Sequence, residues 1–309
     1  MKFISDENYR VDKFLTKKLD VSRNQIESLI KKSCVKINQK VIKKGGEKLK
    51  IGDLVEVTFP DIKKLDNKKN VEFDIDILYE DEDLMVINKP PKLVVHPAPS
   101  VKEATLVDWL KSKNYSLSTL AGEERFGIVH RIDKDTSGAL VIAKNNKAHQ
   151  FLSKQLKDKI MGRYYLMLLN EPLKEVKCVN KSIGRNPKNR LKMAYVKNAK
   201  EAKTLFVPIY QNLTAAKLFT GRTHQIRVHL STIGRYILGD ILYGAKNQKI
   251  NRVMLHAYEI YFLHPSGKKI SIIAPLMDDF IQNIPKGFNY EKIDSISNFF
   301  TFSNGMCRE

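Results

Sequence analysis

Two apolar runs with a short polar cluster between them limit the folds open to the middle of this chain. The first run ends at Ile132, the cluster reads DKDTSG from Asp133 to Gly138, and the second run spans Ala139 to Ala143. Apolar segments of this length with polar and glycine punctuation predict a strand, a sharp loop and a second strand. A loop at the end of a rigid sheet is a favourable place for a reactive carboxylate.

The polar cluster also contains a candidate ion pair. If the residues that lead into it are extended, the side chains of Arg131 and Asp133 project from the same face. The guanidinium would then keep the carboxylate ionised near neutral pH. A surface turn with a local ion pair is the alternative interpretation, and spacing alone does not separate the two.

The charge of the chain favours a polyanionic partner. Its 309 residues include 54 Lys and Arg against 34 Asp and Glu, a formal net charge of +20 at pH 7. A basic excess of this size is typical of proteins that bind nucleic acid, although a basic surface that serves solubility would explain part of it. No apolar stretch approaches the length of a spanning helix, and the N-terminus lacks an apolar signal segment, so we expect neither a membrane partner nor secretion.

Cysteine and histidine spacing argues against a metal or redox centre. Cys34, Cys178 and Cys307 lie far apart, which favours reduced thiols in the cytoplasm. His224 and His229 are five residues apart without an accompanying carboxylate pattern, so no metal site is predicted. A glycine-rich phosphate-binding loop is also missing. We therefore expect a reaction without a cofactor.

The first 60 residues form a predicted module of their own. Apolar spacing predicts a helix over 11–19, and Ser22 with Gln25 forms a capping box at the start of a second helix. Alternating apolar residues predict short strands over 35–37 and 55–59. The basic side chains on the second helix are Arg23, Lys31 and Lys32. These charges could simply form a solvated face, but the order of elements and the sequence SRNQIESLIKKSCVKINQK resemble the S4 RNA-binding domain, which implies that they contact RNA.

Composition shifts divide the rest of the chain. We predict an S4-like α/β domain over residues 1–60, a polar linker over 61–70, a catalytic domain over 71–285 and a C-terminal tail over 286–309. In the catalytic domain, apolar periodicity predicts further strands and helices, among them a strand over 163–170.

Four motifs in the catalytic domain resemble those of the RluA-type RNA pseudouridine synthases. HRIDKDTSG at 130–138 and GRTHQIRVHL at 221–230 are specific to that family, whereas KPPKLVVHP at 89–97 and RYYLMLLN at 163–170 are supportive. Lys92 stands where the family usually has glycine, which puts the geometry of that turn in question. The resemblance implies an α+β fold in which helices flank a mixed, largely antiparallel sheet.

The same resemblance implies roles for individual side chains. Asp133 is the catalytic carboxylate, Arg222 is the basic partner that holds it ionised, and Tyr165 lies against the target base. Arg131 fills the space that the flipped uridine leaves. Thr223 can cap a helix that begins here, which places Arg222 just before the helix N-terminus.

Further RNA contacts are predicted from polar residues that core packing does not explain. Residues 182–204 are either a disordered surface or a basic hairpin, and part of this segment resembles one in synthases that act on large-subunit ribosomal RNA. On the hairpin interpretation Arg185 and Arg190 contact RNA. In the 221–230 motif, Gln225 and Arg227 are assigned to RNA binding for the same reason.

The expected activity is the isomerisation of uridine to pseudouridine in RNA, most specifically 23S ribosomal RNA, by a cytoplasmic monomer. Transfer RNA is the alternative substrate. A non-catalytic RNA-binding or ribosome-assembly factor on the same scaffold is a second alternative, although pure binding would not need Asp133, Tyr165 and Arg222 together. A hydrolytic N-glycosidase would need a second carboxylate to activate water, for which Asp135 is the candidate.

Overall fold

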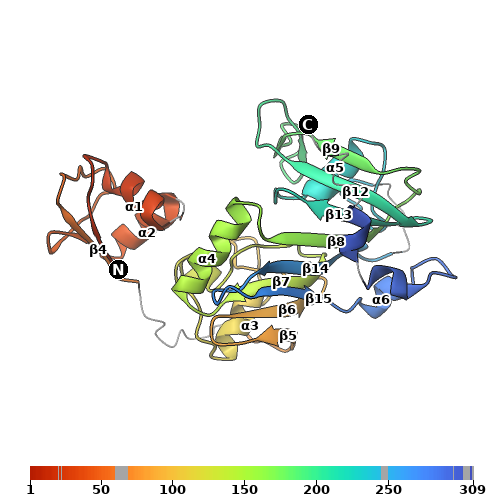
Figure 1. Ribbon diagram of the computed structural model, residues 1–309, viewed down its shortest axis with the longest axis horizontal. Helices are drawn as coiled ribbons and strands as arrows, with labels where there is room; N and C mark the ends of the chain where they lie inside the picture. The colour runs from red at the N-terminus through yellow and green to blue at the C-terminus, as the bar shows by residue number, and fades with distance from the viewer. Residues whose placement is uncertain are drawn as a thin grey trace.

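The computed structural model describes residues 1–19, 21, 23–59, 69–244, 250–294, 296–301 and 307. Ser22, the predicted helix cap, and residues 61–68 of the predicted linker lie outside this part of the chain. Two β-sheets with separate cores organise the described residues (Figure 1).

The smaller sheet belongs to the N-terminal module and has four antiparallel strands in the order β1-β4-β2-β3. Two helices cover it, and their apolar faces meet the strands in a core around Phe14, Ile26 and Val55. The predicted helices and strands of this module are therefore confirmed. Its elements are β1 (Lys2–Ile4), α1 (Val11–Leu19), α2 (Arg23–Lys31), β2 (Val35–Ile37), β3 (Lys40–Val41) and β4 (Leu54–Val57).

The larger sheet has nine strands in the order β5-β6-β7-β14-β8-β13-β12-β9, with β15 also paired to β14. All neighbours are antiparallel except β14 and β7, which are parallel, so the predicted mixed, largely antiparallel sheet is confirmed. The strands are β5 (Asp76–Glu80), β6 (Leu84–Lys89), β7 (Ser137–Ala143), β8 (Gly162–Leu168), β9 (Lys177–Asn180), β12 (Lys203–Tyr210), β13 (Leu213–Leu218), β14 (Leu255–Leu263) and β15 (Lys269–Ile273).

Side chains of consecutive residues in a strand point to opposite faces of the sheet. The central strands are apolar on both faces, so helices pack on both sides of the large sheet. Leu140 and Ile142 of β7 pack with Trp109 on one face, so Trp109 is a core residue. Val141, between them, packs with Leu152 on the other face. The helical elements are α3 (Leu106–Ser112), η1 (Glu123–Arg125), α4 (Asn146–Lys157), α5 (Gln225–Ser231), α6 (Asp278–Ile281), η2 (Tyr290–Ile293) and α7 (Ile296–Thr301).

A separate two-stranded hairpin, β10 (Ile183–Arg185) and β11 (Met193–Tyr195), stands beside α5. It occupies the polar segment for which disorder was the alternative, and the strands pair from Ile183 with Tyr195 to Arg185 with Met193. The prediction of a hairpin is therefore confirmed.

The predicted strand before the polar cluster is wrong. Residues 129–130 bend, residues 131–132 have no regular structure, and only Ile128 forms an isolated bridge, to Ile142. The strand after the cluster, β7, is present and begins beside β14, where Gly138 pairs with Ala257. Gly138 has a φ of +111°, and a Cβ there would lie 2.2 Å from the backbone oxygen of Ala257. Glycine is therefore required for β14 to approach this closely.

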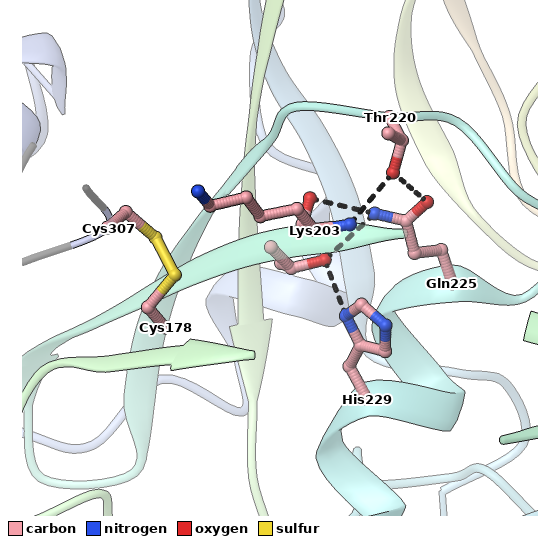
Figure 2. The surroundings of a disulfide bond; sticks show 7 residues. Cys178, Lys203, Thr220, Gln225, His229 and Cys307 are labelled. Atoms are coloured by element: carbon pink, nitrogen blue, oxygen red, sulfur yellow. Dashed lines mark hydrogen bonds between the residues drawn. A yellow bond between two sulfur atoms is a disulfide. The ribbon is translucent and has the colours of Figure 1, made fainter. Parts of the chain in front are cut away.

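The C-terminal residues do not form a separate tail. Phe300 is fully buried, and its ring stacks on Tyr164 of β8 at a centroid distance of 4.7 Å. Cys307 forms a disulfide with Cys178 of β9 (Figure 2), so the expectation that these cysteines are reduced is also wrong. The predicted boundary at residue 285 fails because the described residues beyond it join the core of the large sheet. Among the described residues, no helix is both long and apolar enough to cross a membrane.

Candidate active site

A hollow at the centre of the large domain brings together side chains from three motifs. The loop before β7 supplies Asp133, β8 supplies Tyr165, and the start of α5 supplies His224 and Arg227. The remaining apolar wall comes from Ile132, Leu218, Ile226 and Leu255. A hollow with an apolar wall and one carboxylate at its edge suits a flat, weakly polar ring whose chemistry takes place near that carboxylate.

The sheet makes room around Tyr165. In the register of the strands, Tyr165 of β8 lies between Ala216 of β13 and Ala257 of β14, and Ala257 lies next to Gly138 of β7. Cross-strand neighbours share one face of a sheet, so three small residues leave space beside a single ring. Tyr165 itself is 4% exposed. Burial raises the pKa of Tyr165, so its hydroxyl stays protonated and its ring acts as a wall of the hollow rather than as a base.

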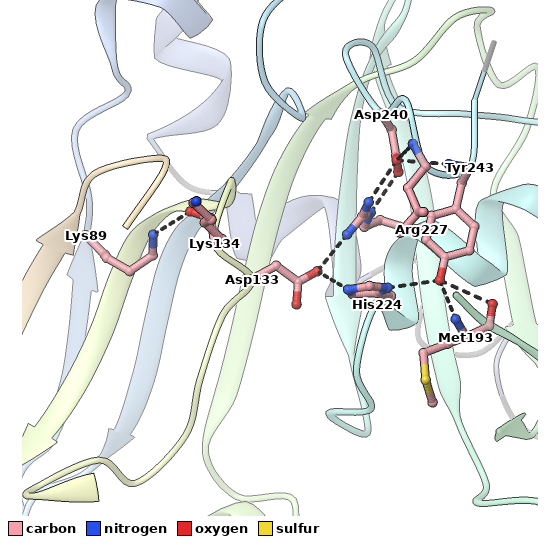
Figure 3. Close-up of polar contacts among 9 residues, drawn as sticks. Lys89, Asp133, Lys134, Met193, His224, Arg227, Asp240 and Tyr243 are labelled. Atoms are coloured by element: carbon pink, nitrogen blue, oxygen red, sulfur yellow. Dashed lines mark hydrogen bonds and ion pairs between the residues drawn. The ribbon is translucent and has the colours of Figure 1, made fainter. Parts of the chain in front are cut away.

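Arg227 is the cation beside Asp133. Its Nη1 donates to Oδ2 of Asp133 at 3.3 Å, while Nε and Nη2 donate to the two carboxylate oxygens of Asp240 at 2.7 and 2.8 Å (Figure 3). Burial opposes the charge on this guanidinium, but the hydrogen bond and charge of Asp240, helped by Asp133, outweigh it and raise the pKa of Arg227. The two-pronged contact with Asp240 fixes the plane of the guanidinium, so the remaining nitrogen, Nη1, points at Asp133.

The prediction that Arg222 is the ionic partner of Asp133 is wrong. The Nε of Arg222 donates to the backbone oxygen of Glu201 at 2.8 Å, although the residue does line the hollow. The reason lies in where the helix begins. α5 starts at Gln225 after His224, whose φ of +55° is left-handed, so Arg222 remains in the preceding loop while Arg227 occupies the first turn. Thr223 is accordingly not the N-cap residue.

Gln225 and Arg227 were predicted to contact RNA, and the structure places both elsewhere. Gln225 is 3% exposed, and its amide accepts from Thr220 and from the backbone of Arg222 while it donates to Lys203 and Thr204 (Figure 2). All the strong hydrogen-bonding positions of this amide are thus used inside the protein. Arg227 is committed to the two carboxylates.

Lys89 supports the loop that carries Asp133. Its side chain is fully buried, and Nζ donates to the backbone oxygens of Pro90, Leu93 and Lys134 at 2.6, 3.0 and 3.1 Å. Burial lowers the pKa of Lys89 to about 7, and the carboxylates of Asp135 and Asp133 oppose this shift. Three carbonyl acceptors match the three donors of an ammonium group, which we therefore take to be charged.

Lys89 also ties the loop that carries Asp133 to the motif in which Lys92 replaces the usual glycine. Lys92 has a φ of +63°, so the turn keeps a left-handed conformation despite the side chain. The geometry of this turn was in question from the sequence. Its backbone at Lys92 is left-handed, a conformation that glycine adopts most easily.

The other predicted RNA contacts lie on exposed surfaces. Arg131 is exposed beside Asp133 at the mouth of the hollow. Lys31 at the end of α2 and Lys32 just after it are exposed, whereas Arg23 at the start of α2 is partly neutralised by Asp12, whose Oδ2 is 2.8 Å away. On the hairpin, the exposed residues Arg185 and Arg190 are joined by a bond from the guanidinium of Arg185 to the backbone oxygen of Arg190.

Sequence reasoning did not find three residues of this site. Asp240 holds Arg227, Lys89 holds the loop, and Tyr243 contacts His224. The available signals were the acidic residue and the tyrosine of GDILYG at 239–244 and the lysine that opens KPPKLVVHP. In the described part of the chain, no group of three or more His, Cys, Asp or Glu side chains is placed to hold a metal ion.

Comparison with known proteins places this chain in one class, the isomerases that act on uridine in RNA. Residues 83–232 match the family model for RNA pseudouridylate synthase, and residues 10–55 match that for the S4 domain. A human structure, RNA pseudouridylate synthase domain containing 1, aligns with a TM-score of 0.55 at 25% identity, covering 66% of this chain and 84% of that one.

Two relatives that align over most of the chain support the same class. An uncharacterized RNA pseudouridine synthase of Helicobacter pylori (strain J99) is 51% identical over 310 residues and 95% of both chains. Ribosomal large subunit pseudouridine synthase D of Zymomonas mobilis is 36% identical over 290 residues, 88% of this chain and 91% of that relative. The chain therefore belongs to the RNA pseudouridine synthase family, and it carries an N-terminal S4 domain.

Proposed function

We propose that this isomerase converts specific uridines of 23S ribosomal RNA to pseudouridine, with Asp133 as the acting carboxylate. The observation that carries the proposal is the position of Asp133, held by Arg227 at the edge of a hollow whose wall is Tyr165. One oriented carboxylate in a site that excludes water is what this chemistry requires.

The reaction rearranges bonds within one nucleotide. The bond from C1′ of the ribose to N1 of the uracil breaks, the base turns, and C5 bonds to C1′. C5 then loses its proton and N1 gains one, so the composition of the RNA is unchanged. Asp133 acts either as a nucleophile or as the base that takes a proton, and Tyr165 confines the loose uracil against the apolar wall.

Uridine must leave the RNA stack before it can enter the hollow. Flipping a base out costs a few kcal/mol, and side chains that fill the gap recover part of this cost. Arg131, exposed beside Asp133, is the residue that we assign to this task. Basic residues of the S4 domain and of the hairpin supply phosphate contacts that hold the RNA in register.

The choice of 23S ribosomal RNA rests on two supports. The Zymomonas relative is named for the ribosomal large subunit. The hairpin β10–β11 coincides with the segment that resembles synthases of this specificity. Transfer RNA is the second candidate substrate within the same reaction class. We further propose that the protein works in the cytoplasm, where this RNA is assembled, and as a monomer, because one chain supplies every residue of the site.

Mapping pseudouridine across total RNA from a strain that lacks the protein tests both the reaction and the substrate. We expect one or more sites in 23S ribosomal RNA to revert to uridine. The wild-type gene should restore them, and Asp133→Asn, which keeps the shape but removes the charge, should not. Loss of pseudouridine from transfer RNA alone would mean that the substrate is transfer RNA and not 23S ribosomal RNA. If Asp133→Asn restores the pseudouridine sites as well as the wild-type gene does, Asp133 is not the catalytic carboxylate.

A further inference from the structure

Asp133 has a second neighbour that the reaction scheme leaves without a task. The Nε2 of His224 lies 3.8 Å from Oδ2 of Asp133, the same oxygen that Arg227 contacts. On the other side of the ring, Nδ1 of His224 lies 2.9 Å from the hydroxyl of Tyr243. The two ring nitrogens of His224 therefore lie between the Asp133 carboxylate and the half-buried phenol of Tyr243 (Figure 3).

Tyr243 is itself held by the hairpin. The backbone N–H of Met193, at the start of β11, donates to the Tyr243 hydroxyl at 2.7 Å, and the backbone oxygen of Met193 lies 3.2 Å from it. The ring of Tyr243 stands edge-on to His224, and Arg227 lies over it at 5.0 Å from the ring centroid. Tyr243 thus touches both residues that face Asp133.

These contacts allow two tautomers of His224, and the shorter contact favours one of them. The Tyr243 hydroxyl accepts from Met193, so it has one proton to donate, either to Nδ1 of His224 or to the oxygen of Met193. Donation to Met193 would leave the proton of a neutral imidazole on Nδ1 and point the Nε2 lone pair at the Asp133 carboxylate. Donation to Nδ1, the shorter of the two contacts, places N–H on Nε2 instead, where it attracts the carboxylate.

The backbone of His224 points separately to a functional role for this residue. His224 is held in the left-handed region, with φ +55°, at the start of α5 and makes no side-chain cap there. A non-glycine residue persists in this conformation where its surroundings hold it, often at functional sites. Burial lowers the pKa of His224, with the carboxylate of Asp133 opposing the shift, which keeps the ring neutral near pH 7.

We propose that His224 and Tyr243 are positioning residues for the proposed reaction. Tyr243, anchored on the hairpin backbone, sets the tautomer of His224 so that Nε2–H orients Asp133 toward the uridine. The 3.8 Å separation is longer than a hydrogen bond, and contacts of this kind tighten once substrate is bound. The inference rests on the proposed function, because it assigns Asp133 as the acting group.

Removal of single hydrogen-bonding groups tests it. Tyr243→Phe keeps the ring that contacts His224 and Arg227 but deletes the hydroxyl. We expect the single-turnover rate at saturating RNA to fall about tenfold or more, with the dissociation constant for RNA changed less than threefold. Tyr290→Phe, which deletes an exposed hydroxyl on η2, is the matched control and should stay within twofold in both quantities.

A pair of substitutions at His224 separates orientation from folding. His224→Gln can place an amide N–H near the position of Nε2, whereas His224→Asn is too short to reach Asp133. Asparagine tolerates the left-handed backbone better than most residues, so strain does not explain a loss in this variant. We expect the glutamine variant to turn over at least fivefold faster than the asparagine variant, with both proteins folded by thermal melting.

Three results would overturn the inference. One is a rate loss of less than fivefold in Tyr243→Phe, and another is a loss of affinity with normal saturated turnover. The third is an equal loss of rate in the two folded His224 variants. If the wild-type protein forms no pseudouridine on the mapped substrate, the proposed function fails instead, and that result is distinct from all three.

Discussion

Asp133 and Arg227 lie 94 positions apart in the chain, and Nη1 of Arg227 is 3.3 Å from Oδ2 of Asp133. Asp240 holds the same guanidinium through the N–H groups of Nε and Nη2, which lie along one edge. A cation held in this way cannot swing toward the RNA backbone, so its charge serves the carboxylate.

This arrangement predicts opposite results at the two arginines of one motif. Arg227→Lys keeps a positive charge but loses the planar fork that bridges Asp240 and Asp133. We expect its single-turnover rate at saturating RNA to fall more than tenfold, while Arg222→Lys stays within threefold of wild type. Tritium release from 5-tritiated uridine RNA measures both. The reverse order would return the role of ionic partner to Arg222.

The second prediction concerns the contact between β7 and β14. Gly138→Ala places a Cβ 2.2 Å from a backbone oxygen and at a φ of +111°, so either the strands separate or the loop moves. We expect a loss of unfolding free energy of about 3 kcal/mol or more, measured by urea denaturation. Gly234→Ala is the control, because its φ of +68° is also positive but a Cβ there would meet nothing within 4 Å. It should cost about 1 kcal/mol, and equal costs at the two positions would contradict the clash.

The third prediction concerns acid stability. His256 is completely buried; its Nε2 donates to the backbone oxygen of Ala274, and its Nδ1 accepts from the hydroxyl of Ser137. Burial lowers the pKa of His256 to about 4. Between about pH 6.5 and 4 the unfolded chain therefore binds more protons than the native one, and stability falls as the pH falls.

The size of this effect follows from the pKa. A drop from about 6.5 to about 4 amounts to roughly 3 kcal/mol from His256 by pH 4, at about 1.4 kcal/mol per unit. His256→Gln cannot titrate, so the stability difference between wild type and variant should shrink by this order between pH 7 and pH 4. Urea denaturation at both values measures it, and a difference that stays constant would show that His256 does not titrate in this range.

The fourth prediction concerns the S4 domain. Lys31→Gln combined with Lys32→Gln should weaken RNA binding uniformly across sequences and leave turnover at saturating RNA unchanged. Removing one lysine–phosphate pair on a single strand lowers the slope of log K against log salt by about 0.7, so removing two should lower it by about 1.4. The double variant Lys268→Gln and Lys269→Gln, where the turn after β14 enters β15, is matched in charge and should not change the slope. An unchanged slope in the α2 variant would remove these lysines from the RNA interface.

Local patterns predicted most of the elements because each depends on residues close together in the chain. The spacing of Val11, Phe14 and Leu15 predicts α1, and the apolar run after Gly138 predicts β7. The apolar run before Asp133 has the composition of a strand but does not form one, because it has no strand partner beyond the bridge at Ile128. The prediction of a separate C-terminal tail was wrong for a related reason. Phe300 becomes a core residue only when Tyr164, far away in the sequence, lies beside it.

The sequence by itself determined the class of the protein, through motifs that place Asp133 and Tyr165 in a recognisable order along the chain. The tertiary structure alone decided which arginine faces Asp133. Arg222 and Arg227 share one motif, and their directions depend on the residue at which α5 begins, because each helical residue turns the next side chain by about 100°. That starting point is set by the left-handed His224 and by hydrogen bonds from Gln225 to a distant strand, and Arg227 is then fixed by Asp240 from a later loop. Contacts between residues this far apart exist only once the chain has folded.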